Sequence, residues 1–206
     1  MTQSEALMTQ EAALPEIAAE DALRADLYDF LAAILARPPG EALLAQTAAL
    51  SGDATRLGEA VTALARVAGV SKPAAVEREF NALFIGLGRG ELLPYASYYL
   101  TGFLNEKPLA GLRRDMAARG ITRAQNVYEP EDNIASLMEM MAGMIRGRFG
   151  KPASLVEQQA FFSKHIGPWA GHFFTDLEAA NSSVLYASVG RVFMEIEAQG
   201  FRMSGA

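Results

Sequence analysis

Apolar residues recur at steps of three and four along most of this chain, and this spacing is the feature that most limits its fold. A first stripe ends at the Pro-Pro-Gly break of residues 38–40 and consists of Leu23, Leu27, Phe30, Leu31, Ile34 and Leu35. A period of about 3.6 residues places such side chains on one face of a helix. No segment combines sustained alternation of apolar and polar residues with the turns that bound strands. The sequence therefore predicts an all-α fold, a single helical bundle of about ten helices.

Turn and capping residues predict where the further helices begin and end. Short segments rich in alanine and leucine are expected to be helical at about 40–50 and 54–68. The later helices are expected from Ser71 and Pro73 to Phe84, within 92–99, at 107–119, at 134–149, from Ser154 to Ile166, from Trp169 to Leu177, and at about 183–198. Ser154 and Glu157 match a capping box at the start of one of them.

Three spaced glycines, Gly86, Gly88 and Gly90, follow one of the predicted helices. A phosphate-binding loop follows a strand, opens a helix and ends in Gly-Lys-Ser/Thr, and this run has none of these features. Glycine is the residue that most readily ends a helix. We expect the run to terminate the helix before it.

The chain is predicted to form one domain after a flexible start. Residues 1–18 are rich in alanine, glutamate and threonine and lack aromatic residues, which is typical of a flexible lead-in. Residues 19–206 are expected to form the helical domain. Within it, the segment 120–128 has little hydrophobic periodicity, so it is the candidate hinge between an N-terminal and a C-terminal set of helices.

Composition narrows the classes of partner and compartment. A net charge of −6, with 18 lysines and arginines spread thinly, argues against nucleic acid. No stretch approaches the roughly 18 apolar residues of a membrane span, and the N-terminus lacks the basic start and apolar run of a secretory signal. The absence of cysteine excludes disulfides and thiolate metal sites. We therefore expect a cytoplasmic protein without stable membrane insertion.

The stretch Tyr128–Asn133 places three carboxylates and a proline before a methionine-rich helix. One interpretation is a helix start, with Pro130 in the first helical position and the carboxylates favoured by the helix dipole. The other is an interaction site. The methionines, which are Met138, Met140, Met141 and Met144, suit an adaptable core or a surface that accommodates varied apolar peptides.

Metal and catalytic sites have little support in the sequence. The two histidines, His165 and His172, are separated by Gly167 and Pro168, which interrupt the helix that would align them. No nucleophile motif or H-E-x-x-H pattern is present. We expect neither a metal nor another cofactor, and no enzyme activity.

Three motifs, in this order, resemble the TorD/DmsD/NarJ family of cytoplasmic chaperones, which mature bacterial molybdenum-cofactor enzymes. The first joins F-N-A-L-F-I-G to L-P-Y-A-S-Y-Y, the second is Y-E-P-E-D-N-I-A, and the third is Q-Q-A-F-F-S-K-H-I-G-P-W. They are similar to the family's aromatic-L-F-x-G and P-Y-x-S-x-Y elements, its E-P-x-D-H-I signature and its F-F-x-x-H-L-x-P-W element. One position departs from this pattern: Asn133 stands where the family has histidine, and asparagine cannot become cationic.

The resemblance implies a TorD-like chaperone domain at residues 19–206 that binds the apo-form of a molybdoenzyme catalytic subunit. The client would be of the formate dehydrogenase or the sulfoxide/N-oxide reductase type. Binding would occur through the client's twin-arginine signal peptide, for cofactor insertion and proofreading before export. Because members of the family can exchange helices between protomers, both a monomer and a helix-swapped dimer stay open.

The resemblance also marks residues for binding the client and its signal peptide. They are Pro94, Tyr95, Ser97, Tyr98, Glu129, Pro130, Glu131, Asp132, Asn133, His165 and Trp169. The carboxylates could pair with the arginines of the signal, while the tyrosines and nearby methionines receive its apolar segment.

Two alternatives remain open from the residues alone. One is a helical small-molecule-binding protein or enzyme with a pocket around His165, Trp169 and the carboxylates of residues 129–132. The other is a general helical adaptor without a molybdoenzyme client.

Overall fold

A computed structural model describes residues 17–200, with side chains described for 17–195. Within these residues the chain forms ten α-helices and one π-helical turn and no strand, which confirms the all-α prediction. In chain order the elements are α1 (Ala19–Ala36), α2 (Glu41–Ala48), α3 (Arg56–Val70), α4 (Pro73–Phe80), the π-helical η1 (Asn81–Ile85), α5 (Ala96–Thr101), α6 (Lys107–Ala118), α7 (Ile134–Arg146), α8 (Leu155–His165), α9 (Gly167–Ala179) and α10 (Leu185–Gly200). Most of the predicted flexible lead-in, residues 1–16, lies outside the described part of the chain.

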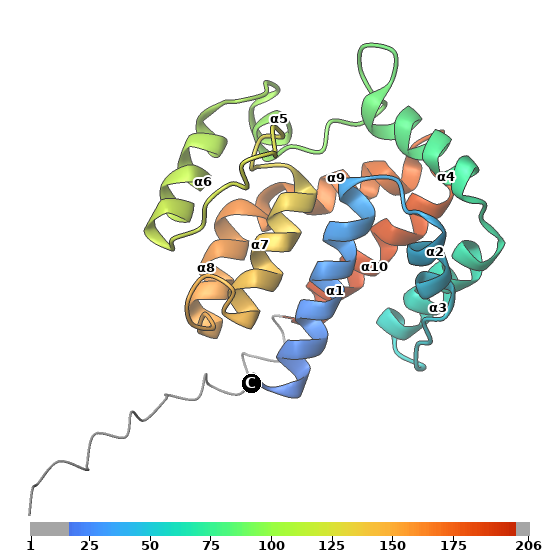
Figure 1. Ribbon diagram of the computed structural model, residues 1–206, viewed down its shortest axis with the longest axis horizontal. Helices are drawn as coiled ribbons and strands as arrows, with labels where there is room; N and C mark the ends of the chain where they lie inside the picture. The colour runs from blue at the N-terminus through green and yellow to red at the C-terminus, as the bar shows by residue number, and fades with distance from the viewer. Residues whose placement is uncertain (1–16, 201–206) are drawn as a thin grey trace, which may run out of the picture.

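The helices are arranged around a central pair. Helix α1 lies along α7 in the middle of the molecule, with α5 and α6 at one end and α2, α3 and α4 at the other (Figure 1). Helix α10 packs against both α3 and α9, so the last helix joins the N-terminal helices to the C-terminal ones. In the described residues, no helix has the length and apolar character needed to cross a membrane.

The methionines of α7 belong to the core of the bundle. Met138, Met140, Met141 and Met144 are all buried. The interpretation of these side chains as a peptide-binding surface is therefore wrong, and their adaptability serves packing between helices.

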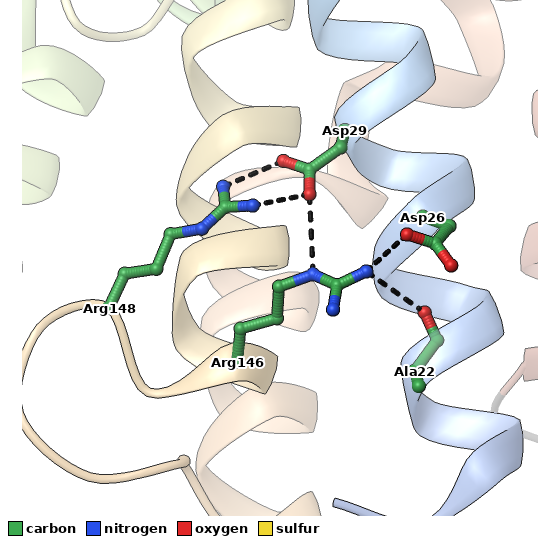
Figure 2. A network of polar contacts seen from close by, with 5 residues as sticks. All are labelled: Ala22, Asp26, Asp29, Arg146 and Arg148. Carbon is green, nitrogen blue, oxygen red and sulfur yellow. Dashed lines mark hydrogen bonds and ion pairs between the residues drawn. The ribbon is translucent and has the colours of Figure 1, made fainter.

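An ion-pair network fastens α1 to the end of α7 (Figure 2). Arg148 donates to both carboxylate oxygens of Asp29, at 2.7 and 2.5 Å. Arg146 forms an ion pair with Asp26, lies 3.4 Å from Asp29 and donates to the backbone oxygen of Ala22 at 3.4 Å. The network spans two successive turns of α1, so it aligns the two helices as well as joining them.

Glycines end two helices at positive φ angles. Gly86 (φ 63°) ends η1, and a Cβ atom there would lie 1.9 Å from the backbone oxygen of Arg89. The prediction that the glycine run terminates a helix is confirmed. Gly147 (φ 72°) follows the last residue of α7, Arg146, so the helix ends three residues earlier than expected.

Three local expectations differ from the structure. Residues 92–95 are not helical, and the helix starts only at Ala96. Helix α7 starts at Ile134, so Pro130 does not occupy a first helical position and the carboxylates precede the helix. Leu23, which belongs to the first predicted apolar stripe, is exposed, since it keeps 66% of its surface. The capping box of Ser154 and Glu157 is present as predicted.

The candidate hinge, residues 120–128, lies in the connection between α6 and α7. It is irregular, as expected, but two of its residues contact the rest of the domain. Ile121 is buried, and the guanidinium of Arg123 lies 3.9 Å from the carboxylate of Glu131. The hinge role stays a prediction, as does the choice between a monomer and a helix-swapped dimer.

Candidate functional site

Two of the three motifs lie side by side in the structure. Tyr95 and Asn133 form an isolated antiparallel β-bridge. The N–H of Ala96 donates to the oxygen of Asp132 at 3.0 Å, and the N–H of Ile134 donates to the oxygen of Pro94 at 2.9 Å. The backbone therefore joins P-Y-A-S to D-N-I directly, although helix α6 and the 120–128 segment separate them in the chain.

The carboxylate of Asp132 caps helix α5. Its Oδ2 accepts a hydrogen bond from the N–H of Ser97 at 2.7 Å, and both residues are almost fully buried. The residue at the N-cap position of α5, Tyr95, supplies no side-chain cap. An acceptor at this position satisfies one of the free N–H groups of a helix start and interacts favourably with the helix dipole. Oδ1 of Asp132 has no hydrogen-bond partner among the described residues.

Asn133 caps the next helix. Its Oδ1 accepts a hydrogen bond from the N–H of Ala135 at 2.9 Å at the start of α7. Asparagine is among the best residues at this position. The residue that departs from the family pattern therefore has a structural role that does not need an imidazole.

Glu131 is held by two arginines, Arg113 on α6 and Arg123 in the segment 120–128. Its Oε2 accepts hydrogen bonds from Nε and Nη2 of Arg113 at 3.0 and 2.8 Å, and Arg123 is close to Oε1. Burial acts to raise the pKa of Glu131, but the hydrogen bonds and charges of the arginines outweigh it, so the pKa lies below its usual value. This carboxylate is therefore already engaged within the protein.

Glu129 has a different environment. Its carboxylate accepts a hydrogen bond from the hydroxyl of Tyr95. The residue as a whole is exposed, but partial desolvation of its carboxyl raises the pKa. No arginine or lysine in the described residues forms an ion pair with it, so Glu129 can accept a cation from outside.

A groove of about 640 Å³ opens where α1, η1 and the start of α7 meet, and we call it the α1–α7 groove. Pro94, Tyr95 and Asn133 form one end of it. Its apolar lining includes Ala32, Leu35, Ala36, Phe84, Ile85 and Val127, and its carboxylates are Asp29, Glu129 and Glu139. Ile85 and Val127 are exposed to solvent. The groove thus offers apolar surface beside negative charge.

A second cavity, of about 420 Å³, uses other side chains of the same bridge. It is lined by Ala96 and Asp132, whereas Tyr95 and Asn133 line the α1–α7 groove. His165 also lines the second cavity.

His165 is buried at the end of α8. Its Nε2 lies 2.7 Å from a carboxylate oxygen of Asp115, which also accepts a hydrogen bond from Lys164. Burial lowers the pKa of His165, and the attraction of Asp115 only partly offsets it. The indole N–H of Trp169 donates to the backbone oxygen of His165 at 2.8 Å, and Trp169 lines neither cavity.

The predicted site residues do not form a single surface. Four line the α1–α7 groove, namely Pro94, Tyr95, Glu129 and Asn133. Two line the second cavity, namely Asp132 and His165. The others, which are Ser97, Tyr98, Pro130, Glu131 and Trp169, line neither of these cavities. Tyr98 instead accepts a hydrogen bond from Arg89 at 2.8 Å, with the guanidinium 5.4 Å from its ring centre.

The positions of these residues argue against the small-molecule alternative, which requires a single pocket around His165, Trp169 and the carboxylates of residues 129–132. Glu129 lines the groove, His165 lines the second cavity and Trp169 is part of the core, so these residues do not share one pocket. Within the described side chains there is also no group of three or more histidine, cysteine, aspartate or glutamate residues that could hold a metal ion.

Sequence reasoning missed most of the groove lining, including Asp29, Ile85 and Glu139. Asp29 and Glu139 lie on separate helices, and each reads as an ordinary charged position on a helix surface. Ile85 lies within the first motif, between the predicted helix and the glycine run, and no binding role was expected for it. Only the packing of α1 on α7 brings them to the same groove.

Comparisons with known proteins agree with the motifs. A family model described as the nitrate reductase delta subunit matches residues 51–175. The chain is similar to the chaperone protein TorD of Vibrio cholerae (31% identity over 121 residues, 55% of each chain). It is also similar to the chaperone protein TorD of Vibrio atlanticus (28% identity over 124 residues, 56% of this chain and 58% of the other). The matched region spans about half the length of these curated relatives.

The fold is similar to that of a solved structure described as a redox enzyme maturation protein from Archaeoglobus fulgidus. The TM-score is 0.56 at 20% sequence identity, over 86% of this chain and 94% of the other. This likeness concerns the fold. The family model, in contrast, matches more than half of the 206 residues and includes all three motifs. The chain therefore belongs to the nitrate reductase delta subunit family, which is the TorD/NarJ family that its motifs resemble.

Proposed function

We propose that this protein is a cytoplasmic chaperone, without catalytic turnover, that binds the apo-form of a molybdoenzyme catalytic subunit. It would hold a precursor of the formate dehydrogenase or the sulfoxide/N-oxide reductase type for cofactor insertion and would delay export until insertion is complete. Family membership and the similarity to TorD chaperones support the general role.

The α1–α7 groove is the observation that carries this proposal. A twin-arginine signal peptide combines two arginines with an apolar segment, and the groove combines carboxylates with apolar side chains. Arginine pairs with carboxylates through charge-assisted, often bidentate hydrogen bonds. Apolar lining from α1 and η1 provides the complementary surface for the apolar segment.

The contacts within the protein indicate which carboxylates meet the client. Asp132 is buried and caps α5, and Glu131 is held by Arg113, so these two are poor acceptors for arginines from outside. Glu129 and Glu139 are exposed, and no ion pair within the described residues engages them. We assign arginine recognition to Glu129 and Glu139, whereas the resemblance marked residues 129, 131 and 132.

A synthetic peptide tests this assignment. The probe carries two consecutive arginines followed by an apolar segment, and a matched probe carries two glutamines instead. Calorimetry should show that the arginine probe binds at least about tenfold more tightly, since a hydrogen bond to a charged group contributes roughly 1.5–3 kcal/mol. The double variant Glu129→Gln, Glu139→Gln should weaken this preference strongly, because Asp29 is then the only carboxylate left in the groove lining.

The control is Glu77→Gln, because Glu77 is an exposed carboxylate on α4 that does not line the groove. It removes one charge of the same sign and should keep the preference for arginine. Equal affinities of the wild-type protein for both probes would contradict the assignment. So would a double variant that prefers the arginine probe as strongly as the wild-type protein does.

A further inference from the structure

The turn after α7 directs an arginine back towards the groove. With Gly147 in the left-handed conformation, the N–H of Arg148 donates to the oxygen of Gly143 at 2.8 Å and that of Gly147 to Met144 at 3.4 Å. These two bonds form a Schellman motif, which reverses the chain at a helix end. Arg148 therefore leaves α7 pointing towards α1 rather than continuing along the helix (Figure 2).

Arg148 occupies a carboxylate of the groove in bidentate geometry. Both terminal nitrogens of its guanidinium donate to Asp29, at 2.7 and 2.5 Å. Asp29 is one of the three carboxylates that line the α1–α7 groove. This parallel pair of hydrogen bonds is the geometry in which any arginine prefers to bind a carboxylate.

A second groove carboxylate also acts on Arg148. The pKa of Arg148 is raised, chiefly by its hydrogen bonds to Asp29 and additionally by the charge of Glu139. Asp29 lies on α1 and Glu139 on α7, and both line the groove. The guanidinium thus pairs with Asp29 and is attracted by Glu139, without forming an ion pair with Glu139.

We propose that Arg148 is an internal competitor for the arginine of the client: in the free protein it occupies Asp29, and a client arginine takes Asp29 by displacing it. The inference rests on the proposed function, because it concerns occupation of the same groove. Because a ligand must displace Arg148, only a segment that carries an arginine beside apolar residues binds tightly enough to take its place. Isolated cations bind weakly.

The surroundings permit this exchange without loss of the helix pair. The side chain of Arg148 keeps 44% of its surface exposed, so it can turn into solvent. Arg146 is more buried, at 27%, and holds Asp26 and the backbone oxygen of Ala22. Its Nε also stays 3.4 Å from Asp29, so Asp29 keeps this contact when Arg148 leaves. The contact between α1 and α7 therefore retains Arg146 and the apolar core when Arg148 leaves.

Peptide affinity tests the proposal. Arg148→Gln should bind the arginine probe about fivefold more tightly than the wild-type protein does, which corresponds to removing competition from one exposed ion pair. Affinity for the glutamine probe should be unchanged. In the Asp29→Asn background, Arg148→Gln should produce no gain, because the contested carboxylate is absent.

A charge-matched control separates competition from long-range attraction. Arg37 also lines the groove, and in the described residues it forms no ion pair with Asp29. Arg37→Gln removes the same charge and should raise the affinity for the arginine probe less than Arg148→Gln does. Thermal unfolding of each variant checks that the helices remain packed.

The outcomes separate this inference from the proposed function. If the wild-type protein prefers the arginine probe but Arg148→Gln binds it no better, or gains no more than Arg37→Gln, the competitor role is overturned and the groove assignment stands. If the wild-type protein does not distinguish the two probes, the groove assignment itself fails and this inference fails with it.

Discussion

The carboxylate of Asp132 accepts the N–H of Ser97 at 2.7 Å, so an aspartate just before α7 caps helix α5, 35 residues earlier in the chain. Together with the bridge between Tyr95 and Asn133, this contact fixes the two motifs to each other. The pairing places Tyr95 and Asn133 on the α1–α7 groove and Asp132 on the second cavity. The acidic motif thus builds the wall of the groove as well as contributing residues to it.

Removal of the Asp132 carboxylate should destabilise the protein. Asp132→Ala leaves the buried N–H of Ser97 without its acceptor, which costs roughly 1–3 kcal/mol. Asp132→Asn keeps an oxygen that can accept this hydrogen bond and should cost less. Urea denaturation followed by circular dichroism measures both changes. An unchanged midpoint for Asp132→Ala would show that the cap contributes nothing to stability.

Asn133 should contribute as a helix cap irrespective of client binding. Asn133→Ala should lower the free energy of unfolding by about 0.5–2 kcal/mol, whereas Asn133→Asp should be nearly neutral because aspartate caps equally well. Asn133→His restores the residue of the family pattern, and we expect it to be less stable than the aspartate variant. A histidine variant that is more stable than the wild-type protein would contradict the capping role.

Stability should depend on the protonation of His165. Because burial lowers its pKa in the folded protein, the unfolded chain takes up the proton first as the pH falls. The contribution of His165 is therefore complete above the ordinary histidine pKa of about 6.5 and declines as the pH falls from there to the lower folded pKa. Urea denaturation at several pH values between about 7.5 and 5 measures this slope.

The second histidine provides the control. His172 is exposed on α9, so His172→Gln should leave the pH dependence unchanged. In His165→Gln the decline below about pH 6.5 should be smaller. Identical slopes for the wild-type protein and His165→Gln would mean that this histidine does not govern stability in that range.

Gly86 should be intolerant of a side chain. Gly86→Ala combines a positive φ with a clash against the backbone oxygen of Arg89. It should lower the free energy of unfolding by about 2 kcal/mol or more. Gly88 also has a positive φ, but a Cβ there meets nothing within 4 Å, so Gly88→Ala should cost only the conformational part, about 1 kcal/mol. Thermal unfolding of both variants compares the two contributions. Equal losses of stability in Gly86→Ala and Gly88→Ala would contradict the close approach of the Arg89 backbone to Gly86.

Much of the fold follows from local sequence signals. The 3.6-residue stripes predict the helices, and the capping box at Ser154 forms as expected. Helix starts without such signals were less predictable. Pro130 suits a first helical position, but the backbone of residues 132–134 bonds to the first motif, so α7 begins only after Asn133.

Which residues make up the site was harder to predict from the sequence. The motifs identified Tyr95, Glu129 and Asn133, which do line the groove. They also grouped Glu131 and Asp132 with Glu129, since adjacent carboxylates look alike in a sequence. Their roles differ because Arg113 and the start of α5 reach only two of the three, and these partners come from other parts of the chain.

Capture of the client tests the central claim most directly. The tagged protein is purified from its own cells after anaerobic growth, and the co-eluting proteins are identified by mass spectrometry. The double variant Glu129→Gln, Glu139→Gln and the control Glu77→Gln are treated in parallel. We predict that the wild-type protein and Glu77→Gln retain one molybdoenzyme catalytic subunit and that the double variant loses it. Recovery of unrelated proteins, or equal recovery of the subunit by the double variant, would contradict the account.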